Sequence, residues 1–227
     1  MADLDLRQAF AHVDTWVFDL DNTLYPPSCG LLVQAEQRMT KFVAHRFQIS
    51  EEEAHALRLG LREQHGTALR GLMTDHGVAP DEFFDYVNEL DHSALGTAPD
   101  LSAVLAALPG RKLVYTNASL RHAQRVASAL GLTHLFEDMV CISRSQFIPK
   151  HEPAAYDNFV RVTGTDPRRA AMFEDTATNL VPAYALGFTT VLVTDIGRSG
   201  NRRQPAAAHV HHVTDDLPGF LRALAGT

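Results

Sequence analysis

Residues 13–26 read VDTWVFDLDNTLYP, and this stretch decides the fold. An apolar run ends in two aspartates, Asp19 and Asp21, with one residue between them. The run is too short for a helix and rich in β-branched and aromatic residues, which predicts a buried strand. If the strand continues, both carboxylates face the same side. Such charges about 4 Å apart repel by about 4 kcal/mol at an effective dielectric constant of 20, so we expect a bound cation or one protonated carboxyl group. A solvated turn is the alternative for this pattern alone.

Four more short apolar runs follow along the chain, and each ends in polar residues. Helix-like stretches separate them, with Ser119 placed to cap one and Gly131 to end it. This alternation predicts an α/β fold with a parallel sheet and helices on both faces, whose ligands bind at the carboxyl edge of the strands. The runs are residues 112–115, 139–142, 170–173 and 190–193, and the expected helices are residues 120–130, 153–162, 176–186 and 217–224.

The stretch from residue 27 to residue 97 contains no convincing strand. Ser50 followed by Glu53 is a capping box, which marks a helix start. About seventy helical residues straight after the first strand are typical of a cap inserted over an active site, and a peripheral helical decoration is the alternative. We therefore predict a Rossmann-like core of residues 1–26 and 98–227 with an all-helical cap of residues 27–97. The helices expected in the cap are residues 31–47, 51–64 and 81–90.

Composition narrows the classes of protein to consider. The chain has 227 residues, 45% hydrophobic and 21% charged, with a net charge of −7. An acidic globular chain is a poor candidate for nucleic-acid binding. Its two cysteines, Cys29 and Cys141, form no CxxC pair, and no signal peptide or membrane span is apparent. We expect a cytoplasmic monomer or homodimer that acts on a small molecule, with no membrane or nucleic-acid partner.

A second acidic pair, Glu174 and Asp175, follows the run at 170–173. With Asp19 and Asp21 it predicts four acids at one edge of the sheet. A hard cation with oxygen ligands is the natural counter-ion, and Mg²⁺ is favoured because it retains waters and shares phosphate oxygens with a substrate. Zinc is disfavoured because neither Cys nor His lies in these motifs.

Two further signals suggest an anion site. Thr116 and Asn117 follow the run at 112–115 and precede a helix, where hydroxyl, amide and backbone N–H groups can bind an anion. An ordinary helix cap is the alternative. Lys150 lies on an expected loop. Such a lysine is usually solvated, but here it could supply positive charge near four acids and a phosphate.

Taken in order, these elements resemble the haloacid dehalogenase-like hydrolase superfamily. Residues 19–23 match its DxDxT phosphatase motif, and the similarity runs from about residue 13 to residue 221, cap included. His151 departs from the pattern, because many relatives have proline after the lysine. The second, third and fourth motifs are matched by Thr116, by Lys150 and by Glu174 with Asp175.

The resemblance implies a phosphoric monoester hydrolase with assigned roles. Asp19 would attack phosphorus to form an aspartyl-phosphate. Asp21 would protonate the leaving oxygen and then activate water, with a pKa raised by neighbouring carboxylates. Thr116, Asn117 and Lys150 would hold the phosphoryl oxygens.

The same resemblance implies how magnesium is held. Asp19, Asp175 and the backbone carbonyl of Asp21 would bind Mg²⁺, and Glu174 would act through water. The dehalogenases of the superfamily lack the second aspartate, since a halide needs no proton, so carbon–halogen cleavage is not expected. The supports of the site would be Thr23 and Asn179.

Residues 19–26, DLDNTLYP, resemble the pyrimidine 5′-nucleotidase branch of the superfamily. Hydrolysis of a pyrimidine nucleoside 5′-monophosphate is therefore the leading hypothesis. A phosphatase for a sugar phosphate or phosphoglycolate is the alternative, and a phosphomutase or a non-enzymatic phosphate-binding regulator is disfavoured.

Several other residues invite functional hypotheses but have simpler explanations. Three histidines could bind a metal, but alternation predicts a short strand with exposed histidines; they are His209, His211 and His212. Cap aromatics are mostly core by helical spacing, although one could stack on a base; they are Phe83, Phe84 and Tyr86. Cap cations without an assigned place are Arg38, Arg58, Arg62 and Arg70, and a surface loop is expected around Arg198, Arg202 and Arg203.

Overall fold

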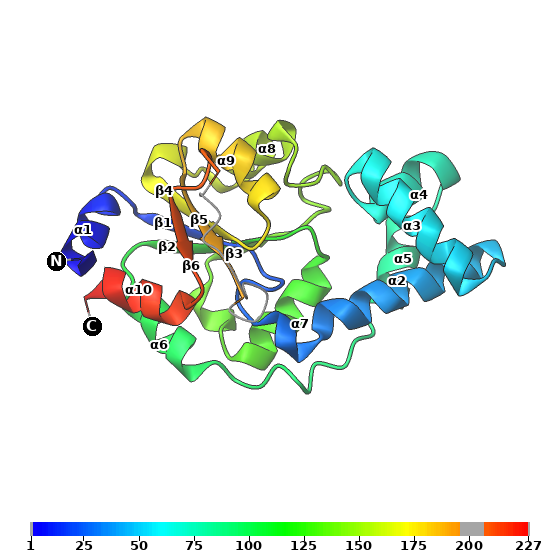
Figure 1. Cartoon of the computed structure of the whole chain (residues 1–227), viewed down its shortest axis with the longest axis horizontal. Helices are drawn as coiled ribbons and strands as arrows, with labels where there is room; N and C mark the ends of the chain where they lie inside the picture. Colours follow the sequence, from blue (N-terminus) through cyan, green and yellow to red (C-terminus); the bar gives the residue numbers. More distant parts are fainter. Residues whose placement is uncertain (1, 196–206, 227) are drawn as a thin grey trace.

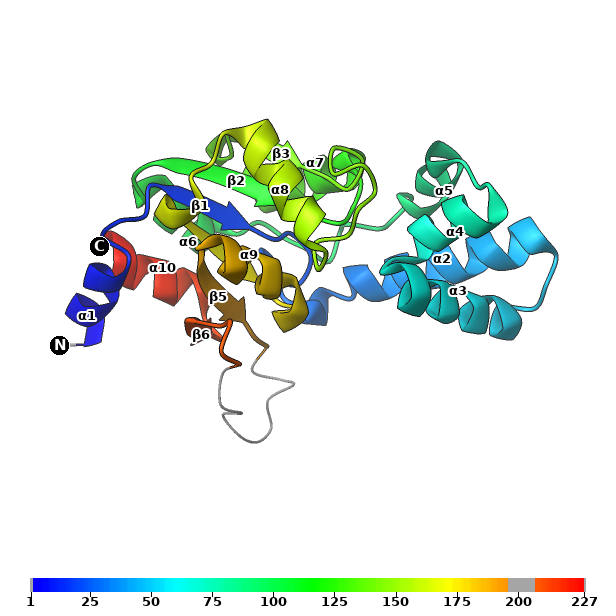
Figure 2. The ribbon, with the colours of Figure 1, turned by 90° about the horizontal axis from the view of Figure 1, so that it is seen from above.

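The computed structural model describes residues 2–195 and 207–226. Its centre is a six-stranded parallel sheet with the strand order β3-β2-β1-β4-β5-β6 (Figures 1 and 2). The predicted α/β class is therefore confirmed. The strands are β1 (Thr15–Phe18), β2 (Arg111–Tyr115), β3 (Asp138–Val140), β4 (Ala170–Glu174), β5 (Thr189–Val193) and β6 (His212–Thr214).

Strand β1 lies in the middle of the sheet, between β2 and β4. All four of its residues are buried, as expected for a parallel strand covered on both faces. Phe18 pairs in register with Val114 and Phe173, and its ring stacks on Phe173 at 4.8 Å. This short, mostly apolar strand thus lies between the two core clusters.

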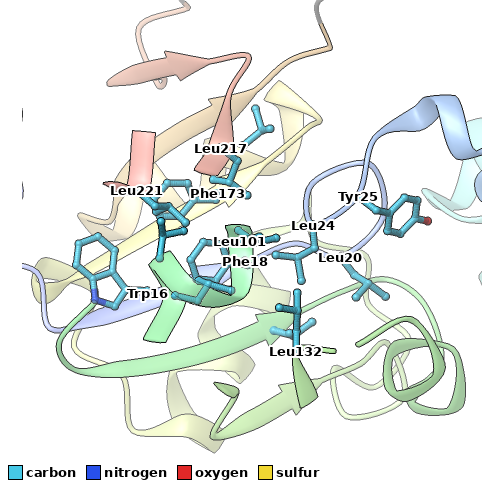
Figure 3. Packing of buried hydrophobic residues seen from close by; sticks show 14 of the residues in the cluster. Trp16, Phe18, Leu20, Leu24, Tyr25, Leu101, Leu132, Phe173, Leu217 and Leu221 are labelled. Atoms are coloured by element: carbon cyan, nitrogen blue, oxygen red, sulfur yellow. The ribbon is translucent and has the colours of Figure 1, made fainter. Parts of the chain in front are cut away.

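Helices cover both faces of the sheet, as predicted. On one face, Phe18 and Phe173 pack against α6 (Pro99–Ala107), α7 (Leu120–Leu130) and α10 (Leu217–Ala225) (Figure 3). On the other, Val17 and Tyr115 pack against α8 (Pro153–Thr163) and α9 (Leu180–Leu186). Neither α6 nor the first helix, α1 (Ala2–Ala9), which lies beside α10, was predicted. Helix α9 begins later than the predicted residue 176, because residues Ala177–Asn179 form a separate 3-10 turn.

Residues 27–97, all described, form helices and loops only. Their four helices group at one end of the molecule (Figures 1 and 2) and enclose an apolar cluster of their own that includes Phe42, Leu61 and Phe83. The Ser50 capping box is present at the start of the second. The helices are α2 (Leu31–Phe47), α3 (Glu51–His65), α4 (Ala68–His76) and α5 (Pro80–Val87).

Helix α4 was not predicted, because Gly66, Gly71 and Gly77 read as breaks. Gly66 and Gly77 do end helices, in the left-handed conformation that glycine favours. Gly71 lies inside α4, where a Cβ atom would come 2.7 Å from the Cβ of Leu61 on α3. Glycine at this position lets two cap helices approach closely. Among the described helices, none has the length and apolar character that crossing a bilayer requires.

Candidate active site

The carboxyl ends of β1 and β4 lie side by side and bring acidic residues together. Asp19 follows β1, and its backbone N–H donates to the carbonyl of Phe173 at 2.8 Å. Glu174 ends β4 and Asp175 follows it. Carboxylate oxygens of Asp19, Glu174 and Asp175 all lie within 4.8 Å of one another. The structure thus places three of the four predicted acids close together.

Asp21 lines the same pocket as these three acids, but its carboxylate is not part of the group whose oxygens lie within 4.8 Å of one another. Strand β1 ends at Phe18 and the chain turns, with Asn22 in the left-handed region at φ 60°. The alternation that would keep Asp19 and Asp21 on one face therefore stops. Asp21 Oδ1 instead accepts hydrogen bonds from the Tyr25 hydroxyl at 2.5 Å and from His122 Nε2 at 2.8 Å. Figure 3 shows the Tyr25 hydroxyl directed away from the apolar cluster.

Lys150 balances the acidic cluster from inside the protein. Its side chain is buried, and Nζ donates to Asp19 Oδ1, to Glu174 Oε2 at 2.5 Å and to the carbonyl of Tyr115 at 3.1 Å. Charge-assisted hydrogen bonds of this kind are the strong ones. The residue predicted on a loop is therefore the charge centre of the site and not a solvated lysine.

Burial and neighbouring charges set the pKa values of these groups. Burial raises the pKa of Asp19 to about 6, against the lowering effect of Lys150 and with further raising by Asp175 and Asp21. Burial, then the charge of Asp19, raise the pKa of Glu174 well above its usual range. The pKa of Lys150 is raised because the two carboxylates outweigh its desolvation. The cluster holds more negative charge than one lysine neutralises.

The pKa of Asp21 is shifted in the opposite direction. Burial raises it, but the charge and hydrogen bond of His122 and the hydrogen bond of Tyr25 outweigh burial and leave it lowered. We expected a raised pKa from neighbouring carboxylates, and that expectation was wrong because Asp21 is paired with an imidazole. The pKa of His122 is raised in turn, since Asp21 outweighs the lowering effect of burial.

His122 was not among the predicted site residues, although its place three residues after the capping Ser119 could have indicated it. Ser119 caps α7 as predicted, and its Oγ accepts from the backbone N–H of His122 at 3.1 Å. His122 is therefore in the first turn of the helix that follows the second motif, at the carboxyl edge of the sheet. Tyr25 and Asn22 were also missed; the Asn22 amide donates to Asp175 Oδ2 at 3.3 Å.

Thr116 and Asn117 lie at the end of β2, next to the acidic cluster. Thr116 Oγ1 accepts from the backbone N–H of Ala118 at 2.9 Å, which leaves its hydroxyl proton free to donate to a ligand oxygen. Asn117 Oδ1 accepts from the backbone N–H of Lys150 at 3.1 Å and so holds the lysine loop in place. Neither residue caps α7, because Ser119 does so.

Thr23 and Asn179, the two residues expected to support the site, each donate a hydrogen bond to one of the clustered acids. The Thr23 hydroxyl donates to Asp19 Oδ2 at 3.3 Å, and the Asn179 amide donates to Glu174 Oε1 at 3.2 Å. The three clustered acids offer only oxygen atoms, which suits Mg²⁺. The residues present therefore fit a magnesium ion.

In the part of the chain that the structure describes, the histidines near the C-terminus are not grouped as metal ligands would be. His209 Nε2 bonds to the carbonyl of Ala177 at 2.9 Å, and His211 Nδ1 accepts from the backbone N–H of Thr190 at 3.0 Å. His212 lies against Phe10. Of the three, His211 is the exposed one, so the expectation of a strand with exposed histidines was only partly right. Arg198, Arg202 and Arg203 lie outside the described residues.

Two pockets meet at this site. One, of about 550 Å³, is lined by the three clustered acids, Thr116 and Lys150. The other, of about 290 Å³, lies between the cap and the core, and both are lined by Asp21 and Asn117. Asp21 is thus at the junction between the acidic cluster and the cap.

Comparison with known proteins agrees with this geometry. Phosphate metabolism protein 8 from Saccharomyces cerevisiae is 25% identical over 193 residues, which cover 77% of this chain; the chain spans 60% of the length of that relative. The fold resembles L-2-haloacid dehalogenase from Xanthobacter autotrophicus, with a TM-score of 0.58, 18% identity and coverage of 95% of this chain and 99% of that one.

The fold also resembles the putative HAD-hydrolase YfnB from Bacillus subtilis bound to magnesium, with a TM-score of 0.59, 15% identity and coverage of 93% and 98%. A family model for haloacid dehalogenase-like hydrolases matches residues 13–187, more than half of the chain. With the four motifs placed at one edge of the sheet, the chain belongs to the haloacid dehalogenase-like hydrolase family.

Proposed function

We propose that this hydrolase is a magnesium-dependent phosphatase that acts through an aspartyl-phosphate, with a pyrimidine nucleoside 5′-monophosphate as substrate. The observation that carries the proposal is the cluster of Asp19, Glu174 and Asp175, whose oxygens lie within 4.8 Å of one another, with buried Lys150 bonded to Asp19 and Glu174. Asp19 and Asp175, with the backbone carbonyl of Asp21, would hold the magnesium ion. Glu174 would act through water. The bound ion would stabilise the negative charge of the phosphoryl oxygens.

In the first step Asp19 attacks phosphorus, and the bond from phosphorus to the ester oxygen breaks as the aspartyl-phosphate forms. Asp21 gives its proton to the departing oxygen. In the second step Asp21 takes a proton from water, whose oxygen attacks phosphorus and releases phosphate and Asp19. The Thr116 hydroxyl donates a hydrogen bond to a phosphoryl oxygen. Lys150 offsets negative charge at the site in both steps. The negative charge of a bound ester favours the protonated form of Asp21 at the start.

Asp21 favours a phosphatase over a dehalogenase. A halide ion leaves without a proton, whereas an alkoxide does not leave readily until it is protonated. Asp21 is two residues from Asp19 in sequence and lines the same pocket, so it can reach a group attached to phosphorus. The name of the yeast relative also refers to phosphate metabolism, which supports this chemistry.

The substrate assignment rests on the DLDNTLYP sequence and on the cap pocket beside Asp21. A mostly apolar pocket of about 290 Å³ suits a base better than a small hydrophilic leaving group such as glycolate. A sugar-phosphate phosphatase is the alternative on the same core, and a phosphate-binding regulator would not need Asp21. We expect the protein to be a cytoplasmic monomer or homodimer. Its catalytic core would consist of residues 1–26 and 98–227, and its cap of residues 27–97.

A panel of phosphate esters at equal concentration tests the proposal. Wild type is expected to hydrolyse UMP and CMP faster than AMP, ribose 5-phosphate and phosphoglycolate, and to lose activity when EDTA removes magnesium. Asp19→Asn should bind UMP without turnover, and Asp21→Asn should lower kcat by about 10²- to 10⁴-fold. Equal rates for all esters would refute the nucleotidase assignment, and no hydrolysis of any ester would refute the phosphatase.

A further inference from the structure

The pocket between the cap and the core has a wall that is mostly apolar and aromatic. Cap residues supply Phe84 and Leu69 among others, and the core supplies Ser119 and His122. The pocket meets the catalytic pocket at Asp21, the residue expected to protonate the leaving oxygen. A group attached to that oxygen would therefore extend into this space.

Arg58 of α3 lines this pocket and is almost completely buried, with 3% of its surface exposed. Its Nε is buried without a hydrogen-bond partner. One Nη atom lies 3.5 Å from His55 Nδ1, a weak contact. A guanidinium stays charged at any physiological pH, and a buried charge without a partner is unfavourable. Its hydrogen-bonding capacity is available to a ligand in the pocket.

The other arginines of the cap differ from Arg58 in this respect. No carboxylate among the described residues lies within the 4.0 Å ion-pair distance of Arg58, whereas each of the others has one. The pairs are Arg38 with Glu89 at 3.5 Å, Arg46 with Glu82 at 3.1 Å, Arg62 with Glu36 at 3.9 Å, and Arg70 with Glu152. Arg58 is thus the cap arginine that lines this pocket without a carboxylate at ion-pair distance among the described residues; Glu36, which also lines the pocket, acts on it from farther away.

We propose that Arg58 determines substrate specificity by binding the acceptor edge of the base of a nucleotide substrate. This inference rests on the proposed phosphatase function. A planar guanidinium presents several N–H donors in a fixed fork that suits paired oxygen or nitrogen acceptors. The apolar and aromatic wall suits the face of a flat heterocycle. A sugar phosphate offers neither an aromatic face nor ring acceptors, so it would leave Arg58 unpaired.

The test compares Arg58→Met with wild type, using the full chain loaded with magnesium, on UMP and on ribose 5-phosphate. We expect kcat/KM for UMP to fall about 10- to 150-fold, as for a lost hydrogen bond to a charged group. The value for ribose 5-phosphate should change less than threefold. Arg46→Met is the matched control, because Arg46 pairs with Glu82 outside both pockets; it should change neither value.

A binding measurement separates this inference from the proposed function. Calorimetry of UMP with Asp19→Asn, and with Asp19→Asn combined with Arg58→Met, needs no turnover. Tighter binding to the protein that retains Arg58, with equal binding of ribose 5-phosphate, supports the subsite even if no ester is hydrolysed. Equal UMP binding to both proteins overturns it even if the phosphatase is active.

Folding controls keep the result interpretable. Arg58→Met removes an unpaired buried charge and retains most of the volume, so its Tm is expected to equal or exceed that of wild type. If it fails to fold, Arg58→Lys replaces it, because lysine keeps the charge but lacks the planar fork. A loss on UMP alone supports the inference, and an equal loss on both esters assigns Arg58 a structural role and overturns it.

Discussion

Replacing Lys150 with methionine removes the cation at the centre of the acidic cluster. The buried Nζ of Lys150 contacts Asp19, Glu174 and the carbonyl of Tyr115. Methionine has a similar length but no charge, so two buried carboxylates lose their partner. Removing one member of a buried ion pair destabilises proteins by about 3–5 kcal/mol. For a chain of this size, 1 kcal/mol corresponds to about 2–4 °C in Tm, so we expect Tm to fall by roughly 10 °C in EDTA.

The deficit of Lys150→Met should depend on pH in a defined direction. The pKa of Asp19 is about 6 in the folded protein, against an ordinary value of 3.8. A carboxyl group with a raised folded-state pKa gains protons before the unfolded chain does, so protonation favours folding as pH falls below 6. Without Lys150 the pKa rises further. The difference in unfolding free energy between variant and wild type should therefore shrink between pH 7.5 and pH 4.5.

Urea denaturation of both proteins in EDTA, at pH 7.5 and pH 4.5, measures these quantities. Lys41→Met is the control, since Lys41 is exposed on α2. Added Mg²⁺ should restore part of the stability of the variant, because a cation among the three acids replaces the lost charge. A deficit below about 1 kcal/mol at pH 7.5, or one that grows as pH falls, would refute the view that Lys150 neutralises the cluster.

Three other results follow from the same geometry. Gly71→Ala should destabilise the protein by about 1–3 kcal/mol through overpacking against α3, whereas Gly60→Ala, with open space around its Cβ, should stabilise it by about 0.5–1 kcal/mol; urea titrations compare them. Asn179→Ala should weaken Mg²⁺ binding about 10- to 100-fold in calorimetry, because its amide orients Glu174. Burial lowers the pKa of His212 below 6.5, so wild type should lose stability relative to His212→Asn as pH falls below 6.5.

The central strands of the sheet could be predicted because they are short and mostly apolar. Residues 15–18 and 170–174 are buried, so local composition and tertiary environment agree. The same holds for α2, whose predicted bounds match the structure. Helix α4 was missed because a glycine that serves packing between helices looks the same in a sequence as one that ends a helix. The difference depends on α3, a segment elsewhere in the chain.

The acidic cluster shows the same division between local and tertiary information. The order of the motifs predicted that Asp19, Lys150 and Glu174 would meet at one edge, since the carboxyl ends of parallel strands coincide. The direction of Asp21 could not be obtained in this way, because it depends on a turn that breaks strand alternation at Asn22. Its partner His122 comes from a helix about a hundred residues later.

Asp19 and Asp21 are two residues apart, yet each is paired with a different cation. Lys150 serves the first and His122 the second, and the pKa values of the two carboxyl groups move in opposite directions, upward for Asp19 and downward for Asp21. The proposed roles need the opposite: Asp19 must be ionised to act as the nucleophile, and Asp21 must be protonated to act as the general acid. A divalent cation among Asp19, Glu174 and Asp175 would lower the pKa of Asp19, and the charge of a bound ester would raise that of Asp21. The acid and nucleophile roles would therefore depend on bound Mg²⁺ and substrate, and the chain supplies two carboxylates that are each paired with a different basic side chain.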